Sequence, residues 1–171
     1  MIFLLTFSLS LNSKMQDTSN VRPPLEEKFL EWQGSYGGFK EPRVMVIKDQ
    51  ETWDGIYRMI SGGGVKLSLD FTRYMVIAIF MGEKRTGGYS VNILKADEMD
   101  GIEVMEYMEK GKGQAKPLTR IAKKVFVVEY EEISPGPKSF VTMAITTPYH
   151  VKVVRRSDLS VVFFKHEKIR D

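Results

Sequence analysis

An unbroken apolar run at residues 75–81 (MVIAIFM) constrains the fold of this chain more than any other stretch. The run is short for a helix and rich in Val, Ile and Phe, so it predicts a strand that is buried on both faces and central in its sheet. Gly82 ends the run, and a charged segment follows. Residues 89–93 then alternate between apolar and polar side chains, which is typical of a half-buried strand. We therefore predict a β-hairpin over residues 71–93.

The turn of this predicted hairpin carries the most distinctive short motif of the chain, TGGYS at residues 86–90. Two adjacent glycines permit a positive φ or the close approach of another segment. A second segment, PYH at residues 148–150, also combines a turn residue with a tyrosine. Tyrosine rings offer a rigid contact area with a polar tip, which suits protein recognition. We predict one shared binding surface made of Thr86, Gly87, Gly88, Tyr89, Ser90, Pro148, Tyr149 and His150. In the alternative interpretation, the glycines only turn the chain and both tyrosines fill the core.

The remaining pattern predicts a mainly β protein of the α+β class, with one or two short helices and an antiparallel β-sandwich or rolled sheet. Apolar residues spaced as one helical stripe follow the N-cap residue Asp49, and glycines 62–64 end that helix. Residues 97–101 read as an acidic turn, residues 25–32 as a short helix or a strand, and residues 117–124 as a short helix or a loop. Further strands are predicted at residues 43–48, 102–108, 125–133, 139–146, 149–154 and 160–164.

The start of the chain resembles an export signal. Residues 2–11 form an apolar run whose length suits the core of a signal peptide and is too short to span a bilayer. We therefore predict a leader and linker over residues 1–24, a single β-rich domain over residues 25–171, export from the cytoplasm and no stable membrane span. No basic residue precedes the run, because the first lysine is Lys14. The alternative is a terminal strand or helix that packs on the core of a cytoplasmic protein.

Composition excludes several classes of function. The 25 basic residues are nearly balanced by 22 acidic ones, and no basic block is present, so we predict no nucleic-acid partner. The absence of cysteine excludes disulfides, thiolate metal sites and cysteine nucleophiles.

The two histidines do not indicate catalysis. His150 reads as an outward-facing strand residue and His166 as a solvated tail residue. A triad of Ser90, His150 and Asp70 would lack the G-x-S-x-G nucleophile elbow. We predict no catalytic residue, no metal site and no cofactor.

Several motifs together resemble the C-terminal domain family of PrcB. They are Asp70-Phe71, the strand ending at Gly82, the TGGYS segment, a later proline (Pro135 or Pro137) and Thr147-Pro148-Tyr149-His150. The resemblance covers residues 44–154. It implies a non-catalytic accessory domain that supports an exported bacterial protease complex through protein contacts, so that the partner is another exported protein such as a protease. PrcB is a lipoprotein, and lipid attachment does not carry over to a chain without cysteine.

Two other functions remain open at this point. Residues 86–89 are similar to the Thr-Gly-Tyr loop of chagasin-like protease inhibitors, which are also β-sandwiches. A small hydrolase is the third interpretation, and it would need a concave pocket that holds His150 and a carboxylate. The sequence does not predict the oligomeric state.

Overall fold

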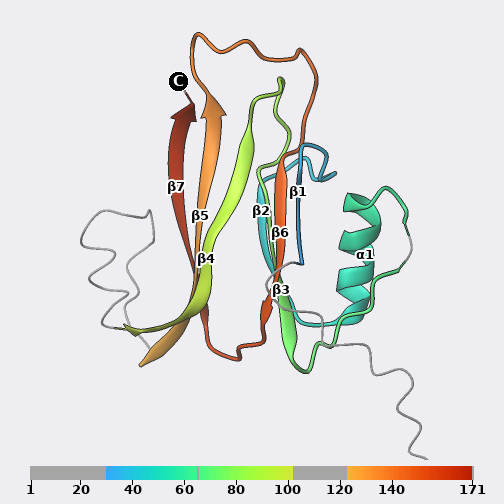
Figure 1. Cartoon of the computed structure of the whole chain (residues 1–171), viewed down its shortest axis with the longest axis vertical. Coiled ribbons are helices and arrows are strands. Elements are labelled where there is room, and N and C mark those ends of the chain that lie inside the picture. Colours follow the sequence, from blue (N-terminus) through green and yellow to red (C-terminus); the bar gives the residue numbers. More distant parts are fainter. Residues whose placement is uncertain (1–29, 65, 102–122, 171) are drawn as a thin grey trace, which may run out of the picture.

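Two β-sheets and one helix make up the part of the chain that the computed structural model describes, residues 30–64, 66–101 and 123–170 (Figure 1). The first sheet has the order β1-β6-β3-β2, and all of its pairs are antiparallel. The second sheet has the order β4-β5-β7. The strands span Glu31–Gly34 (β1), Arg43–Ile47 (β2), Tyr74–Phe80 (β3), Ser90–Asp100 (β4), Lys124–Pro135 (β5), Tyr149–Arg155 (β6) and Val161–Arg170 (β7), and helix α1 spans Gln50–Ile60. The predicted mainly β, α+β sandwich is confirmed.

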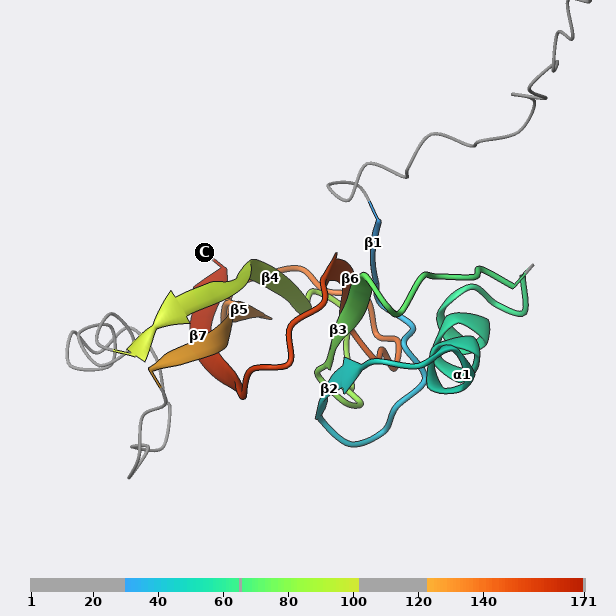
Figure 2. The ribbon, with the colours of Figure 1, turned by 90° about the horizontal axis from the view of Figure 1, so that it is seen from below.

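Strand β3 has the position that its apolar run predicts. It lies between β2 and β6, and all but its first residue are buried. Met75, Ile77 and Ile79 point into a core shared with β4 and β5 of the second sheet. Val76 and Phe80 point to the opposite face, into a core covered by α1. Figure 2 shows α1 on the outer side of the first sheet, away from the second.

Helix α1 forms where its apolar stripe predicts. Asp49 caps it by accepting a hydrogen bond from the Thr52 backbone N–H at 2.8 Å. Trp53 is fully buried against the first sheet, and its indole N–H donates to the Leu67 carbonyl at 2.9 Å. This core holds the helix on the outer face of the first sheet.

The predicted hairpin over residues 71–93 is wrong. Strand β3 pairs with β2 and β6, whereas β4 pairs with β5 in the other sheet. Both edges of β3 are already occupied by strands of its own sheet, so the segment after Gly82 crosses to the second sheet. We name residues 81–89 the β3–β4 loop.

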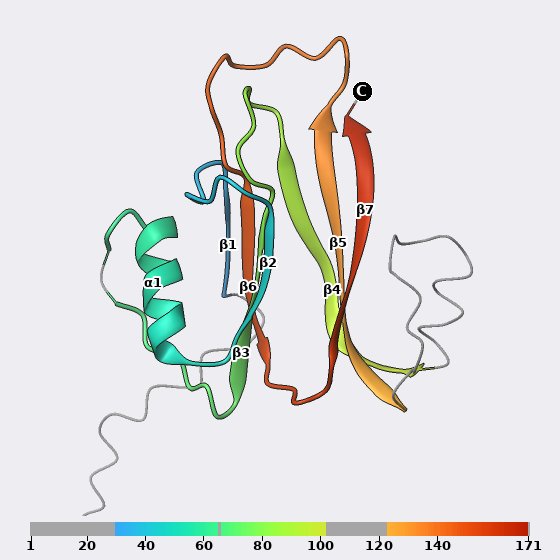
Figure 3. The same ribbon diagram turned by 180° about the vertical axis from the view of Figure 1, so that it is seen from behind.

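One strand pair departs from the predicted antiparallel arrangement, because β7 is parallel to β5. After β5 the chain passes through β6 of the first sheet before it returns as β7 (Figure 3). This detour reverses the chain direction once more, so β7 runs the same way as β5.

Three local predictions need correction. Residues 139–146 do not form a strand of either sheet but belong to a loop over residues 136–148, which we name the β5–β6 loop. Residues 97–100 continue β4 instead of forming an acidic turn, because each of them pairs with a residue of β5. His166 lies in β7, where its Nε2 atom is 2.9 Å from a carboxylate oxygen of Glu129.

Of residues 25–32, the described part enters β1, which favours the strand alternative. The leader (1–24), the strand at 102–108 and most of residues 117–124 lie outside the described residues.

Candidate docking surface at the apex

Two loops meet at one end of the sandwich, which we name the apex. The β3–β4 loop and the β5–β6 loop both carry the chain from one sheet to the other, and in Figures 1 and 3 the β5–β6 loop arches over the β3–β4 loop above the strands. Lys84 and Thr146 exchange two backbone hydrogen bonds, of 2.7 and 2.9 Å. The Gly87 N–H donates to the Thr142 carbonyl at 2.9 Å, and the Thr146 hydroxyl donates to the Thr86 carbonyl at 2.9 Å. The TGGYS motif therefore supports the β5–β6 loop instead of turning a hairpin.

The two glycines of the motif are required by the closeness of this contact. A Cβ atom on Gly87 would lie 2.3 Å from the Thr142 hydroxyl oxygen. Gly88 has a φ of +87°, and a Cβ atom there would lie 2.9 Å from a methyl carbon of Val141. Any larger residue at either position would push the β5–β6 loop away from the β3–β4 loop.

The last two residues of the motif belong to the core and to β4. Tyr89 is half-buried and packs against the core between the sheets. The ammonium group of Lys84 lies 5.6 Å from the centre of its ring, a cation–π contact. Ser90 is the first residue of β4 and pairs with Ile133.

The segment at residues 148–150 is buried throughout. The Pro148 carbonyl accepts a hydrogen bond from the Met81 N–H at 2.9 Å, which places this segment beside the start of the β3–β4 loop. Tyr149 is 7% exposed and stacks on Phe80 in the core under α1, and burial raises the pKa of its phenol. Tyr149 and Tyr89 thus point to opposite faces of the first sheet, and only Tyr89 retains substantial exposure.

His150 joins the two sheets and does not face outward as predicted. Its Nδ1 atom accepts a hydrogen bond of 2.9 Å from the Ile93 backbone N–H of β4. The residue is 6% exposed, and its Nε2 atom has no hydrogen-bond partner among the described residues. The nearest carboxylate oxygen, on Glu31, is 3.7 Å from Nε2, which is too long for a hydrogen bond. Burial lowers the pKa of His150, and the nearby Glu31 carboxylate opposes this effect.

Sequence reasoning missed several exposed apolar side chains of the apex. Phe140, Met143 and Ile145 have relative exposures of 106%, 90% and 61%. All three lie on the β5–β6 loop, and Tyr36, which is 68% exposed, bridges to Thr147 at the end of the same loop. The apolar content of residues 139–146 was the only sequence signal for these side chains. It predicted a strand, because strands and exposed apolar loops have similar compositions. Contiguous exposed apolar side chains are a common property of protein interaction sites.

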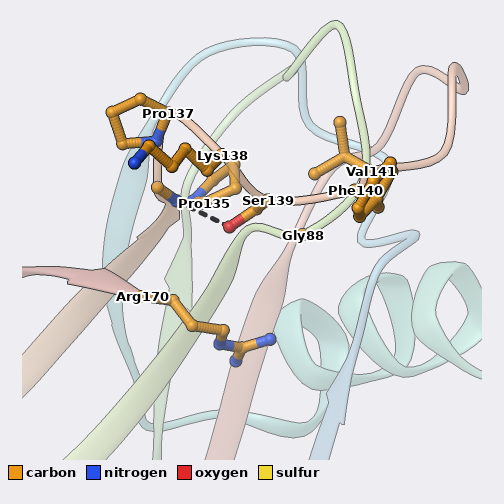
Figure 4. Close-up of a pocket in the computed structure, with 9 residues that line it drawn as sticks. Gly88, Pro135, Pro137, Lys138, Ser139, Phe140, Val141 and Arg170 are labelled. Atoms are coloured by element: carbon orange, nitrogen blue, oxygen red, sulfur yellow. Dashed lines mark hydrogen bonds between the residues drawn. The ribbon is translucent and has the colours of Figure 1, made fainter.

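Two hollows flank the segment from Pro135 to Pro137 at the base of this loop. The first has a volume of about 550 Å³ and is shown in Figure 4. Its described lining residues are Gly88, Pro135, Gly136, Pro137, Lys138, Ser139, Phe140, Val141 and Arg170. The second, of about 740 Å³, lies between the start of the β3–β4 loop and the ends of β5 and β7. Neither hollow is lined by His150.

The residues of the hypothetical triad do not come together. His150 pairs with Ile79 near the apex end of β3, whereas Asp70 precedes the other end of that strand and accepts hydrogen bonds from Thr72. Strands rise by about 3.3 Å per residue, so Asp70 and His150 are separated by most of the length of the sheet. Within the described ranges, no cluster of three or more His, Asp or Glu side chains is arranged to hold a metal ion. No helix of those ranges is long and apolar enough to cross a membrane.

Comparison with known proteins identifies the family. Residues 75–120 and 117–155 match the sequence model of the family described as PrcB C-terminal. No curated protein and no solved structure matches the chain. The matched range contains β3, the β3–β4 loop, β4, β5, the β5–β6 loop and β6, which together build the apex. Residues 75–155 of this chain therefore belong to the PrcB C-terminal family.

Proposed function

We propose that this protein is a non-catalytic accessory domain that docks on another exported protein, a protease being the expected partner, through the apex. The main support for this proposal is the exposure of Phe140, Met143 and Ile145 on the β5–β6 loop. Five hydrogen bonds to the β3–β4 loop hold the β5–β6 loop in place. The family membership supports a PrcB-like accessory role. The apolar run at residues 2–11 supports export.

The energetics of the apex favour contact with a macromolecule. Burying a Phe, Met or Ile side chain that is otherwise in water stabilises a complex by about 1.5–3 kcal/mol each. A loop that is already held in its bound shape also loses little entropy on binding, so more of this energy appears as affinity. The predicted binding residues contribute in different ways. Gly87 and Gly88 allow the loops to approach, Tyr89 anchors the β3–β4 loop in the core, and Tyr149 and His150 support the strands beneath.

The test is a binding measurement with a secreted protease encoded beside this chain. Phe140, Met143 and Ile145 are replaced together by serine, and the affinity of the variant is compared with that of the wild type. We expect an affinity loss of at least about 30-fold, because a single central interface residue contributes about 2 kcal/mol and the variant changes three. The protease should keep its activity when the domain is bound.

Two controls make this test specific. Leu94→Ser changes an apolar residue, 51% exposed, that lies on β4 away from the apex loops, and it should leave binding intact. Unchanged thermal unfolding of the triple serine variant would show that it is folded. The proposal fails if the triple variant binds as well as the wild type. A loss of protease activity on binding would instead support the inhibitor interpretation.

A further inference from the structure

The first hollow at the apex is lined by apolar and by cationic side chains. Phe140 and Val141 lie on one side of it, Lys138 lies on the opposite side, and Arg170 lies below them (Figure 4). The volume of about 550 Å³ is within the usual range for sites that take a few side chains of a ligand. Phe140 is fully exposed at its edge, so the hollow opens onto the docking surface described above.

The two cations of this hollow make no ion pair within the described part of the chain. None of the described residues that line the hollow carries a carboxylate. The second hollow is different, because both of its acids are neutralised by one lysine. Lys165 lies 3.6 Å from a Glu132 oxygen and 2.7 Å from a Glu167 oxygen. Among the described residues, the first hollow is therefore lined by cations without acids, whereas the second hollow is lined by both.

Ser139 adds a hydroxyl group to the lining of the first hollow. Its hydroxyl oxygen accepts a hydrogen bond from the Gly136 N–H at 3.1 Å. A hydroxyl has one proton to donate, and here its oxygen is already used as the acceptor, so the proton is available to an incoming oxygen. Two cations and one hydroxyl donor form a set suited to a carboxylate. The adjoining Phe140 and Val141 suit an apolar side chain next to that carboxylate.

We propose that this hollow receives a loop of the partner protein that carries an Asp or Glu side chain beside a bulky apolar residue. The inference rests on the proposed docking function and specifies what the apex recognises. The acid lies against Lys138, Arg170 and Ser139, and the apolar neighbour lies against Phe140 and Val141. Attraction between the charges is screened by salt, so the interaction weakens as ionic strength rises.

The test uses synthetic peptides and does not require the natural partner. A displayed library of random heptapeptides is selected on the full chain, and the enriched peptides are made with blocked termini. We expect enrichment of an Asp or Glu within two positions of a bulky apolar residue, and at least a tenfold loss of affinity when that acid is replaced by its amide. Enrichment without acids, no enrichment at all, or binding that requires a free terminal carboxylate would overturn the proposal.

Matched variants locate the site. The pair Lys138→Ala and Arg170→Ala should weaken the acidic peptide at least tenfold. The pair Arg58→Ala and Lys124→Ala removes the same charge from exposed positions on α1 and at the far end of β5, and it should leave affinity unchanged. Equal effects of the two pairs would mean a general charge effect and would overturn the proposal.

The two proposals can fail separately. Suppose the triple serine variant of the apex loses the protease while the pair at Lys138 and Arg170 retains it and leaves peptide affinity unchanged. The docking function then stands, and the acidic recognition is wrong.

Discussion

Replacing His150 by leucine tests the connection between the two sheets. Leucine fills a similar space but cannot accept the hydrogen bond that Nδ1 receives from the Ile93 N–H at 2.9 Å. Val91 and Ile93 of β4 are buried beside this junction, and His150 is 6% exposed, so water cannot replace the lost acceptor. A buried donor without a partner costs about 1–3 kcal/mol. For a domain of this size, that corresponds to a decrease in melting temperature of about 2–12 °C.

The assay is urea unfolding at about pH 8, where histidine is neutral in both folded and unfolded chains. The side chains of both tryptophans, Trp32 and Trp53, pack between α1 and the first sheet, with ring centres 5.3 Å apart. Their fluorescence therefore reports the unfolding of the first sheet. His150→Asn is the matched variant, because its amide oxygen can accept from the Ile93 N–H. We expect the asparagine variant to recover part of the stability that leucine loses. A leucine variant as stable as the wild type, or an asparagine variant that recovers nothing, would refute the role given to this hydrogen bond.

Three further predictions concern stability. Burial lowers the pKa of His150, so the unfolded chain binds more protons below about pH 6.5. The contribution of His150 to the free energy of unfolding should therefore be complete above that pH and should decrease as the pH falls. Urea titrations of the wild type and of His150→Asn at several pH values measure the difference. Tyr89→Ala should lower the free energy of unfolding by about 2–3 kcal/mol, because the ring is half-buried in the core between the sheets. A decrease below about 0.5 kcal/mol would make Tyr89 a surface residue. Asp49→Ala should lower the free energy of unfolding by about 0.5–2 kcal/mol through loss of the α1 cap. Asp49→Asn keeps an acceptor oxygen and should lower it less. Calorimetry compares the two variants.

Some features of this protein follow from local pattern alone. The run at residues 75–81 predicts a central strand because only a strand covered on both faces removes that many consecutive apolar side chains from water. The stripe through Trp53 and Ile56 predicts α1, and Asp49 predicts where it starts, because capping is a contact between near neighbours in the chain. The family resemblance could likewise be read directly from the sequence, and the comparison confirms it over residues 75–155.

Features that depend on which segments become neighbours required the tertiary structure. A strand pattern does not identify the pairing partner, so β3 and β4 looked like a hairpin although they belong to different sheets. The exposure of Phe140 depends on whether another segment covers it, and His150 is buried only because β4 crosses beside β6. Alternation and capping act within a few residues, and the sequence by itself therefore determined the central strand and the helix. Burial and hydrogen bonding at the apex arise between residues about 50–60 positions apart, and only the folded chain decides them.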